Sequence, residues 1–130
     1  MKRSAAKPIS AEPQAFAAAQ TKSHINQLCQ CLAQEFQPEK IILFGSYAYG
    51  QPHRFSDIDL LVIMPFQGSP FRQAGIILHR VIQQVGVLPL DLLVRTNEQI
   101  KERLALGDNF IGEIMQRGKV LYEANHVGMD

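Results

Sequence analysis

The sequence lacks the features that mark a membrane-bound, secreted or nucleic-acid-coating protein. Its formal net charge of +1 gives no basic surplus to neutralise a phosphate backbone, so general nucleic-acid binding is not expected. No apolar run approaches the roughly 20 residues that span a bilayer. The start, MKRSAAKPISAEPQAFAAAQ, has basic residues but no apolar signal-peptide region. These absences predict a soluble cytoplasmic domain without a membrane partner.

Cysteine is almost absent as well. Cys29 and Cys31 follow a C-x-C spacing inside a predicted helix, where their side chains point in different directions. A second pair of ligands is missing, so two buried thiols are favoured over a zinc site.

The chain has the size and composition of one ordinary domain. It has 130 residues, of which 46% are hydrophobic, and it contains no internal repeat or low-complexity block. Residues 1–11 are polar and bracketed by prolines, which predicts a flexible N-terminus. Residues 12–125 are expected to form a single domain.

Apolar periodicity and capping residues predict an alternation of helices and strands. The predicted elements are a helix over 14–36, a strand over 40–45, a strand over 57–64, a helix over 70–85 capped by Ser69, a strand over 88–94, helices capped by Thr96 and Asp108, and a weaker strand over 119–123. The 70–85 helix carries an apolar stripe that is assigned to the core: Phe71, Ala74, Leu78, Val81, Ile82 and Val85. This order predicts an α/β (α+β) domain of two layers, with a small mixed sheet packed against helices.

The first predicted strand ends in FGSYAYG, a pattern suited to binding a phosphate. Gly45 lets the backbone turn and approach a ligand closely. Ser46 can cap the following helix, donate a hydrogen bond to a phosphate oxygen, or both, and the N-terminus of a helix favours anions. A Gly-Ser after a strand is usually a simple turn, so this interpretation depends on support from other residues.

Two aspartates stand at the head of the second predicted strand. In a strand, Asp57 and Asp59 face the same side and lie about 6.6 Å apart along it. Their charges repel each other, and a bound divalent cation relieves that repulsion, with Mg²⁺ as the usual choice for carboxylate oxygens. A hydrated strand end in which Asp57 caps a turn explains the pair equally well.

A third carboxylate, Asp91, interrupts the apolar strand LPLDLLV. A carboxylate in a central strand is costly unless it is paired or bound to metal. The alternative is an edge strand with Asp91 facing water, which agrees with Pro89 nearby. If the strands are neighbours, the three carboxylates can hold two Mg²⁺ ions roughly 3.5 to 4 Å apart for in-line attack at phosphorus.

Together these motifs resemble the DNA polymerase β-type nucleotidyltransferase superfamily. The resemblance lies in GSYAYG, in the ten residues between Ser46 and Asp57, in SDIDLLV and in the later LDLLV, and it covers residues 41–94. More narrowly, the chain resembles the minimal nucleotidyltransferases, the MntA-like antitoxins of HEPN/MNT toxin–antitoxin pairs, and its tail through GKVLYE is also similar.

The resemblance implies a role for each motif residue. Gly45 and Ser46 would hold the β- and γ-phosphates of ATP. Asp57 and Asp59 would ligate both metal ions. Asp91 would bind the catalytic metal and help to deprotonate or orient the acceptor hydroxyl.

The same resemblance implies a substrate and a partner. Larger nucleotidyltransferases carry an extra domain that binds the acceptor, for which we expect no room in this chain. The expected reaction is Mg²⁺-dependent transfer of AMP from ATP to a tyrosine hydroxyl of a HEPN ribonuclease toxin. Two alternatives stay open: an antitoxin that neutralises the toxin by binding alone, and a stand-alone transferase that acts on a small molecule or RNA.

One position departs from the family pattern. Family members commonly have an arginine before the second glycine of the GS loop, and this chain has Tyr49 there. His53, Arg54 or Lys40 are candidates to replace that cation. Tyr49 and its neighbour Tyr47 either stack on a base or, as is more usual beside a glycine loop, pack into the core. A late apolar group, Phe110, Ile111, Ile114 and Met115, fits either core or a partner surface.

Overall fold

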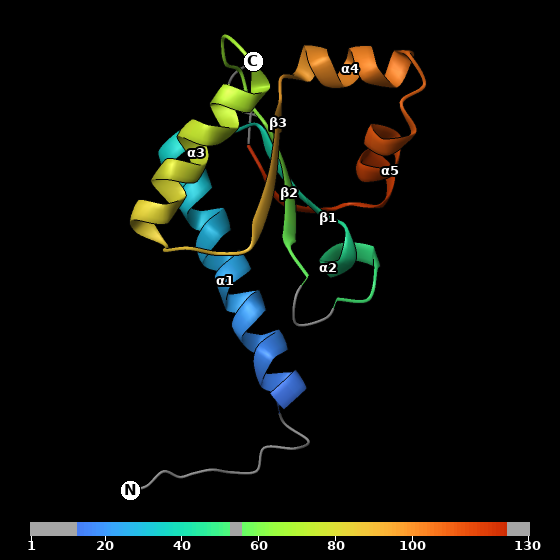
Figure 1. Cartoon of the computed structure of the whole chain (residues 1–130). Helices are drawn as coiled ribbons and strands as arrows, with labels where there is room; N and C mark the ends of the chain where they lie inside the picture. The colour runs from blue at the N-terminus through green and yellow to red at the C-terminus, as the bar shows by residue number, and fades with distance from the viewer. Residues whose placement is uncertain (1–12, 53–55, 125–130) are drawn as a thin grey trace, which may run out of the picture.

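The computed structural model describes residues 13–52 and 56–124, with side chains from residue 20 onward. The predicted flexible segment 1–11 lies outside this part of the chain. The described residues form a sheet with helices on both faces (Figure 1). The elements in chain order are α1 (Pro13–Phe36), β1 (Lys40–Phe44), α2 (Ser46–Tyr49), β2 (Ile58–Ile63), α3 (Pro70–Gln84), β3 (Leu90–Arg95), α4 (Asn97–Ala105), α5 (Asn109–Arg117) and β4 (Lys119–Glu123).

The four strands form one mixed sheet in the order β3-β2-β1-β4. β1 runs antiparallel to both β2 and β4, whereas β2 and β3 are parallel. β3 is therefore at an edge of the sheet, so the edge-strand alternative for Asp91 is right about the position of its strand. Its parallel pairing with β2 nevertheless places Asp91 directly beside Asp59.

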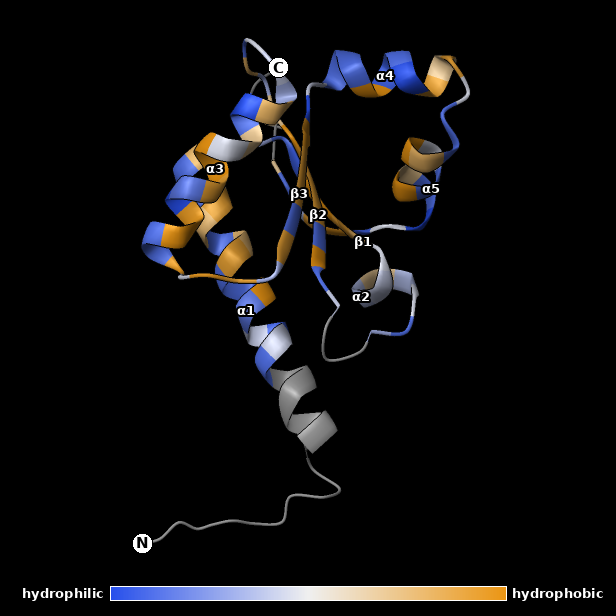
Figure 2. Ribbon diagram, in the orientation of Figure 1, coloured by the Kyte–Doolittle hydropathy of each residue, from blue (hydrophilic) through white to orange (hydrophobic). Residues whose placement is uncertain are grey.

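Alternation along the strands divides the apolar side chains between two cores, and Figure 2 shows the strands as largely hydrophobic. On β1, Ile41 and Leu43 face the larger core under α1 and α3, while Ile42 and Phe44 face a smaller core under α4 and α5. The predicted α/β fold, with a small mixed sheet packed against helices, is confirmed. Because helices cover both faces, the smaller core adds a layer to the two that were expected.

The late apolar group belongs mainly to this smaller core. Ile111 and Ile114 are buried in it and Met115 packs against it. Phe110 is partly exposed and meets the ring of Phe44 edge-on, with the ring centroids 5.8 Å apart. The core interpretation of these residues therefore holds for the two isoleucines.

The predicted helix caps are confirmed. The Ser69 hydroxyl accepts a hydrogen bond from the Arg72 amide at 3.0 Å, and Thr96 forms a capping box with Gln99. Asp108 caps α5 by accepting from the Ile111 amide at 3.0 Å. These caps explain why the helix starts were readable from the sequence, since each is a local side-chain-to-backbone bond.

The cysteines lie on α1 as expected. Cys31 is buried in the larger core, and Cys29 is half-buried with its thiol 3.8 Å from the Leu121 carbonyl oxygen. Burial raises the pKa of both thiols, which keeps them protonated at neutral pH. The prediction of buried thiols is confirmed for Cys31. Among the described residues, no helix is both long enough and apolar enough to cross a membrane.

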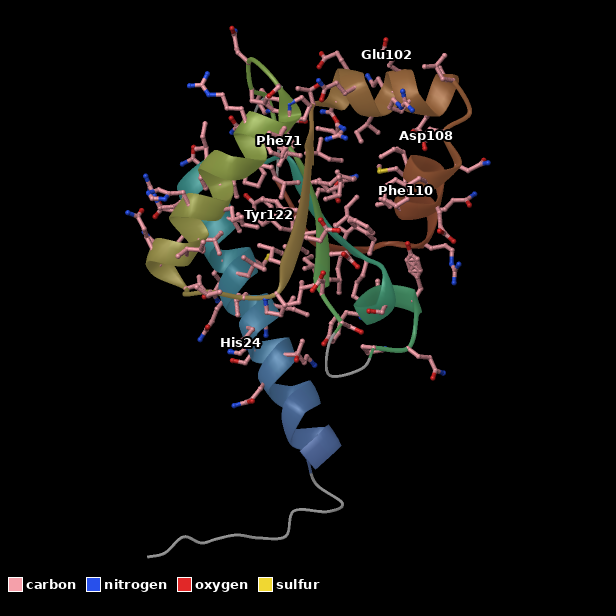
Figure 3. All side chains as sticks on the ribbon, viewed as in Figure 1. His24, Phe71, Glu102, Asp108, Phe110 and Tyr122 are labelled. Carbon is pink, nitrogen blue, oxygen red and sulfur yellow. The ribbon has the colours of Figure 1, made fainter. Side chains whose placement is uncertain are left out.

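The core stripe predicted for α3 is right at Val81 and wrong at three exposed residues, Phe71, Leu78 and Ile82. Phe71, at the first turn of the helix (Figure 3), is 89% exposed and Leu78 is 36% exposed, whereas Val85 is partly buried against the larger core. The buried residues of α3 are Ile77 and Val81. The helix carries two apolar stripes at helical spacing, and its contacts with β3 and α1 decide which of them is buried.

The different burial of the neighbours Ile77 and Leu78 predicts different effects of their substitution on stability. Ile77→Ala should lower the free energy of unfolding by about 2 to 5 kcal/mol, because the side chain is fully buried. Leu78→Ala should cost less than about 1 kcal/mol, because its side chain remains partly in water. Urea unfolding measures both values. Equal losses would contradict this placement of the helix.

Candidate active site

The turn after β1 is built around Gly45. Its φ of 73° lies in the left-handed region, which glycine adopts without steric cost. A β-carbon at this position would lie only 2.1 Å from the Asp59 carboxylate oxygen Oδ2. Glycine is therefore required twice, for the direction of the chain and for the close approach of the Asp59 side chain.

The Gly-Ser loop continues into α2, a single helical turn. The amides of Ala48 and Tyr49 both donate to the Gly45 carbonyl oxygen at 3.0 Å, and the Gly50 amide donates to the Ser46 carbonyl oxygen at 3.2 Å. Gly45 is the N-cap residue, so the capping role considered for Ser46 is wrong. One turn has little macrodipole, so a phosphate bound here would depend on the Ser46 hydroxyl and the first amides of the loop.

The three predicted carboxylates lie at the same end of β2 and β3. Phe44 pairs with Asp59 across β1 and β2, and Asp59 pairs with Asp91 across β2 and β3. Residues in register lie on the same face of a sheet, so this row faces the smaller core. Asp59 is half-buried, whereas Asp57 and Asp91 are exposed. The sheet thus brings together carboxylates that are far apart in the sequence.

The environment of Asp59 is electrostatically unfavourable for its charged form. Its pKa is raised from the usual 3.8 to about 6, first by burial, then by the negative charges of Asp91 and Asp57 and by a hydrogen bond with Asp91. A divalent cation would relieve this repulsion, and oxygen-only donors suit Mg²⁺. The residues present therefore fit a magnesium site.

These carboxylates are neighbours but do not form a closed cage. Within the two described ranges, no group of three or more His, Cys, Asp or Glu side chains is gathered around one point as metal ligands. An open arrangement of this kind agrees with Mg²⁺, which keeps several waters and takes further oxygens from substrate phosphates.

The three candidates to replace the arginine that family members commonly have at the position of Tyr49 differ in where they lie. Lys40 lies at the opposite end of β1 from Gly45 and pairs with Glu123 at 3.6 Å, so it is not placed at this site. His53 and Arg54 lie outside the described residues. Tyr47 packs against the larger core and Tyr49 against the smaller one, which supports the packing interpretation of both rings.

Sequence reasoning missed one charged residue beside the loop. Arg117, in the last turn of α5, holds its guanidinium carbon 4.4 Å from the centroid of the Tyr49 ring. No local motif marks this arginine. Its position follows from the pairing of β4 with β1, which no spacing in the sequence predicts.

The fold is that of a nucleotidyltransferase domain. The profile of the nucleotidyltransferase domain family matches residues 25–121, and the chain belongs to this family. The predicted superfamily and enzyme class are confirmed at that level. A search of curated proteins finds no match.

Solved structures share this fold. A structure described as a toxin–antitoxin with AMP-PNP has a TM-score of 0.53 and 21% identity, over 78% of this chain and 74% of that chain. A putative nucleotidyltransferase from Sulfolobus solfataricus has a TM-score of 0.52 and 19% identity, over 79% of this chain and 86% of that chain. At these identities the likeness supports the fold alone.

Proposed function

We propose that this nucleotidyltransferase is the antitoxin of a HEPN/MNT toxin–antitoxin pair, acting in the cytoplasm. It transfers AMP from ATP to a tyrosine hydroxyl of the HEPN ribonuclease toxin and thereby silences it. The toxin–antitoxin neighbour with AMP-PNP, an ATP analogue, supports both the nucleotide and the kind of partner. Apolar side chains that α3 leaves exposed, among them Phe71 and Ile82, support a protein partner, because such surfaces are typical of interaction sites.

The observation that carries the proposal is the Asp59 carboxylate. It lies against the backbone of Gly45 on one side and beside Asp91 on the other. The carboxylate that we propose as a magnesium ligand is therefore next to a loop suited to the phosphates of a nucleotide.

The reaction is an in-line displacement at the α-phosphorus of ATP. The tyrosine oxygen of the toxin attacks this phosphorus, the new oxygen–phosphorus bond forms, the bond to the bridging oxygen breaks, and pyrophosphate leaves. Asp91, exposed at the sheet edge, orients the hydroxyl and accepts its proton. Ser46 holds the outer phosphates in place, so the leaving group stays aligned with the attacking oxygen.

Asp57, Asp59 and Asp91 would hold Mg²⁺ in this site. When bound, the metal supplies positive charge that stabilises the charge developing on the α-phosphate and on the leaving pyrophosphate. Asp59 has the central place, because it is the half-buried carboxylate between the other two.

The test uses the purified protein, Mg²⁺, ATP and the product of the neighbouring gene. Intact-mass spectrometry should show one or more AMP groups added to that protein, and peptide mapping should place them on tyrosine. If the product of the neighbouring gene stays unmodified under these conditions, the proposed reaction is wrong.

The binding-only alternative makes the opposite prediction for the carboxylates. Replacing Asp57 and Asp59 together by asparagine removes the metal site but leaves the exposed face of α3 intact. If AMP transfer silences the toxin, the double variant no longer protects cells that express it. Protection that survives the substitution would favour neutralisation by complex formation alone.

A further inference from the structure

The described part of the phosphate loop, residues 45–52, has no positive charge of its own. The stretch from Gly45 to Pro52 contains neither lysine nor arginine. The site beside it carries three carboxylates, and a nucleoside triphosphate adds further negative charge. Mg²⁺ balances part of this charge, but phosphate sites usually include an arginine or lysine as well. A cation that the fold brings to the loop from another element would supply this charge.

The end of α5 lies beside the end of β1. Lys119 of β4 pairs with Leu43 of β1. Because the two strands are antiparallel, residues before Lys119 lie toward the residues that follow Leu43. Arg117, two residues before Lys119, therefore lies toward Gly45 and Ser46. Between them, Gly118 packs tightly on β1: a β-carbon there would lie 2.4 Å from the Ile42 side chain and 3.2 Å from the Leu43 carbonyl oxygen. This close packing fixes the end of α5 next to the phosphate loop.

Arg117 is held there by two contacts. Its guanidinium lies over the Tyr49 ring, a cation–π contact, and its Nη1 donates to Glu113 Oε2 at 2.9 Å. About half of the side chain, 55%, remains exposed, so the guanidinium keeps donors free for a ligand. Tyr49 thus acts as a platform that places a cation from a distant helix over the loop.

We propose that Arg117 is a nucleotide-binding residue that contacts the outer phosphates of the triphosphate at the Gly45–Ser46 loop. The planar guanidinium on the flat ring of Tyr49 presents its N–H groups toward phosphate oxygens, a geometry that a lysine does not reproduce. Arg117 acts on binding and alignment of the pyrophosphate leaving group. This inference rests on the proposed nucleotide site.

The test compares two ligands by calorimetry, both with Mg²⁺: AMP-PNP, which has the outer phosphates, and AMP, which lacks them. For Arg117→Gln we expect AMP-PNP binding about tenfold to hundredfold weaker, the usual effect of losing a charged hydrogen bond. AMP binding should be unchanged. Arg117→Lys should restore only part of the loss, because the charge returns without the planar fork.

Two further variants separate the role in binding from a role in folding. Arg103→Gln removes an arginine of similar exposure on α4, paired with Asp108, and should change neither affinity. Tyr49→Arg, added to Arg117→Gln, puts a cation into the loop itself and should recover AMP-PNP binding. A merely structural role of Arg117 would not be repaired in this way.

Each result has a separate meaning. If the wild-type protein binds no AMP-PNP, the proposed nucleotide site fails and the role of Arg117 fails with it. If the wild-type protein binds and Arg117→Gln binds equally well, the role of Arg117 is overturned while the nucleotide site stands. Equal weakening of AMP and AMP-PNP would also overturn it, because the effect must depend on the outer phosphates.

Discussion

Asp59→Asn is expected to abolish AMP transfer and, without metal, to make the protein more stable than the wild type. The amide keeps the shape of the side chain but removes the charge that the proposed metal ion would need. Losing about 4 kcal/mol of transition-state stabilisation corresponds to a rate about a thousandfold lower. The same change relieves the repulsion with Asp91 and Asp57. Rates of AMP transfer and thermal unfolding in EDTA measure the two effects.

The gain in stability should depend on pH. The pKa of Asp59 is about 6 in the folded protein and near 3.8 when unfolded, so the folded state binds this proton more tightly. The contribution of the protonated Asp59 carboxyl to wild-type stability is full below about pH 3.8 and is lost as the pH rises through about 6. Asparagine does not ionise, so the variant should gain over the wild type as the pH rises from 4 to 7.

Saturating Mg²⁺ should make the wild type more stable than Asp59→Asn, the opposite of the order expected in EDTA. If Mg²⁺ binds only the folded site, it should stabilise the wild type and have little effect on the variant. Glu102→Gln, which removes an exposed charge on α4 (Figure 3), is the control and should show neither effect. A wild type that is more stable than Asp59→Asn in EDTA at pH 7 would contradict an unfavourable environment for the charged Asp59 carboxylate.

Local signals in the sequence predicted the elements of this fold well. Helix starts at Ser69, Thr96 and Asp108 are visible because a cap is a contact between residues three apart. The face of α3 was predicted less well, since its two apolar stripes satisfy the same periodicity. Only the packing of the helix on β3 and α1 distinguishes Ile77 from Leu78.

The candidate site shows the same division between local and long-range information. The spacing of Asp57 and Asp59 and the charge of Asp91 in an apolar strand are local signals, and they make these residues candidates. The register that places Asp91 beside Asp59, and Asp59 beside Gly45, depends on strand pairing. Arg117 was missed because it reaches the loop through the pairing of β4 with β1, and in the sequence it looks like the end of a solvated helix.

The close approach of Gly45 and Asp59 leads to the second large expected effect. Gly45→Ala forces a side chain into the left-handed region, which costs about 1 to 2 kcal/mol. It also puts a β-carbon at 2.1 Å from Oδ2 and 3.0 Å from Cγ of Asp59, so the carboxylate must move. Because a displacement of about 1 Å costs on the order of a hundredfold in rate, AMP transfer should fall at least that far. Turnover and urea unfolding measure the two losses.

Gly107→Ala is the matched control, since it has a similar φ of 80° but no atom within 4 Å of the added carbon. It should cost stability through the backbone alone and leave AMP transfer intact. Gly45→Ala should lower the free energy of unfolding by more than Gly107→Ala does, and this excess measures the clash with Asp59. In an Asp59→Ala background that excess should largely disappear, because the clashing oxygen and Cγ are gone and the two substitutions are coupled. An excess that stays the same would mean that Gly45 is needed for the turn and not for the position of the carboxylate.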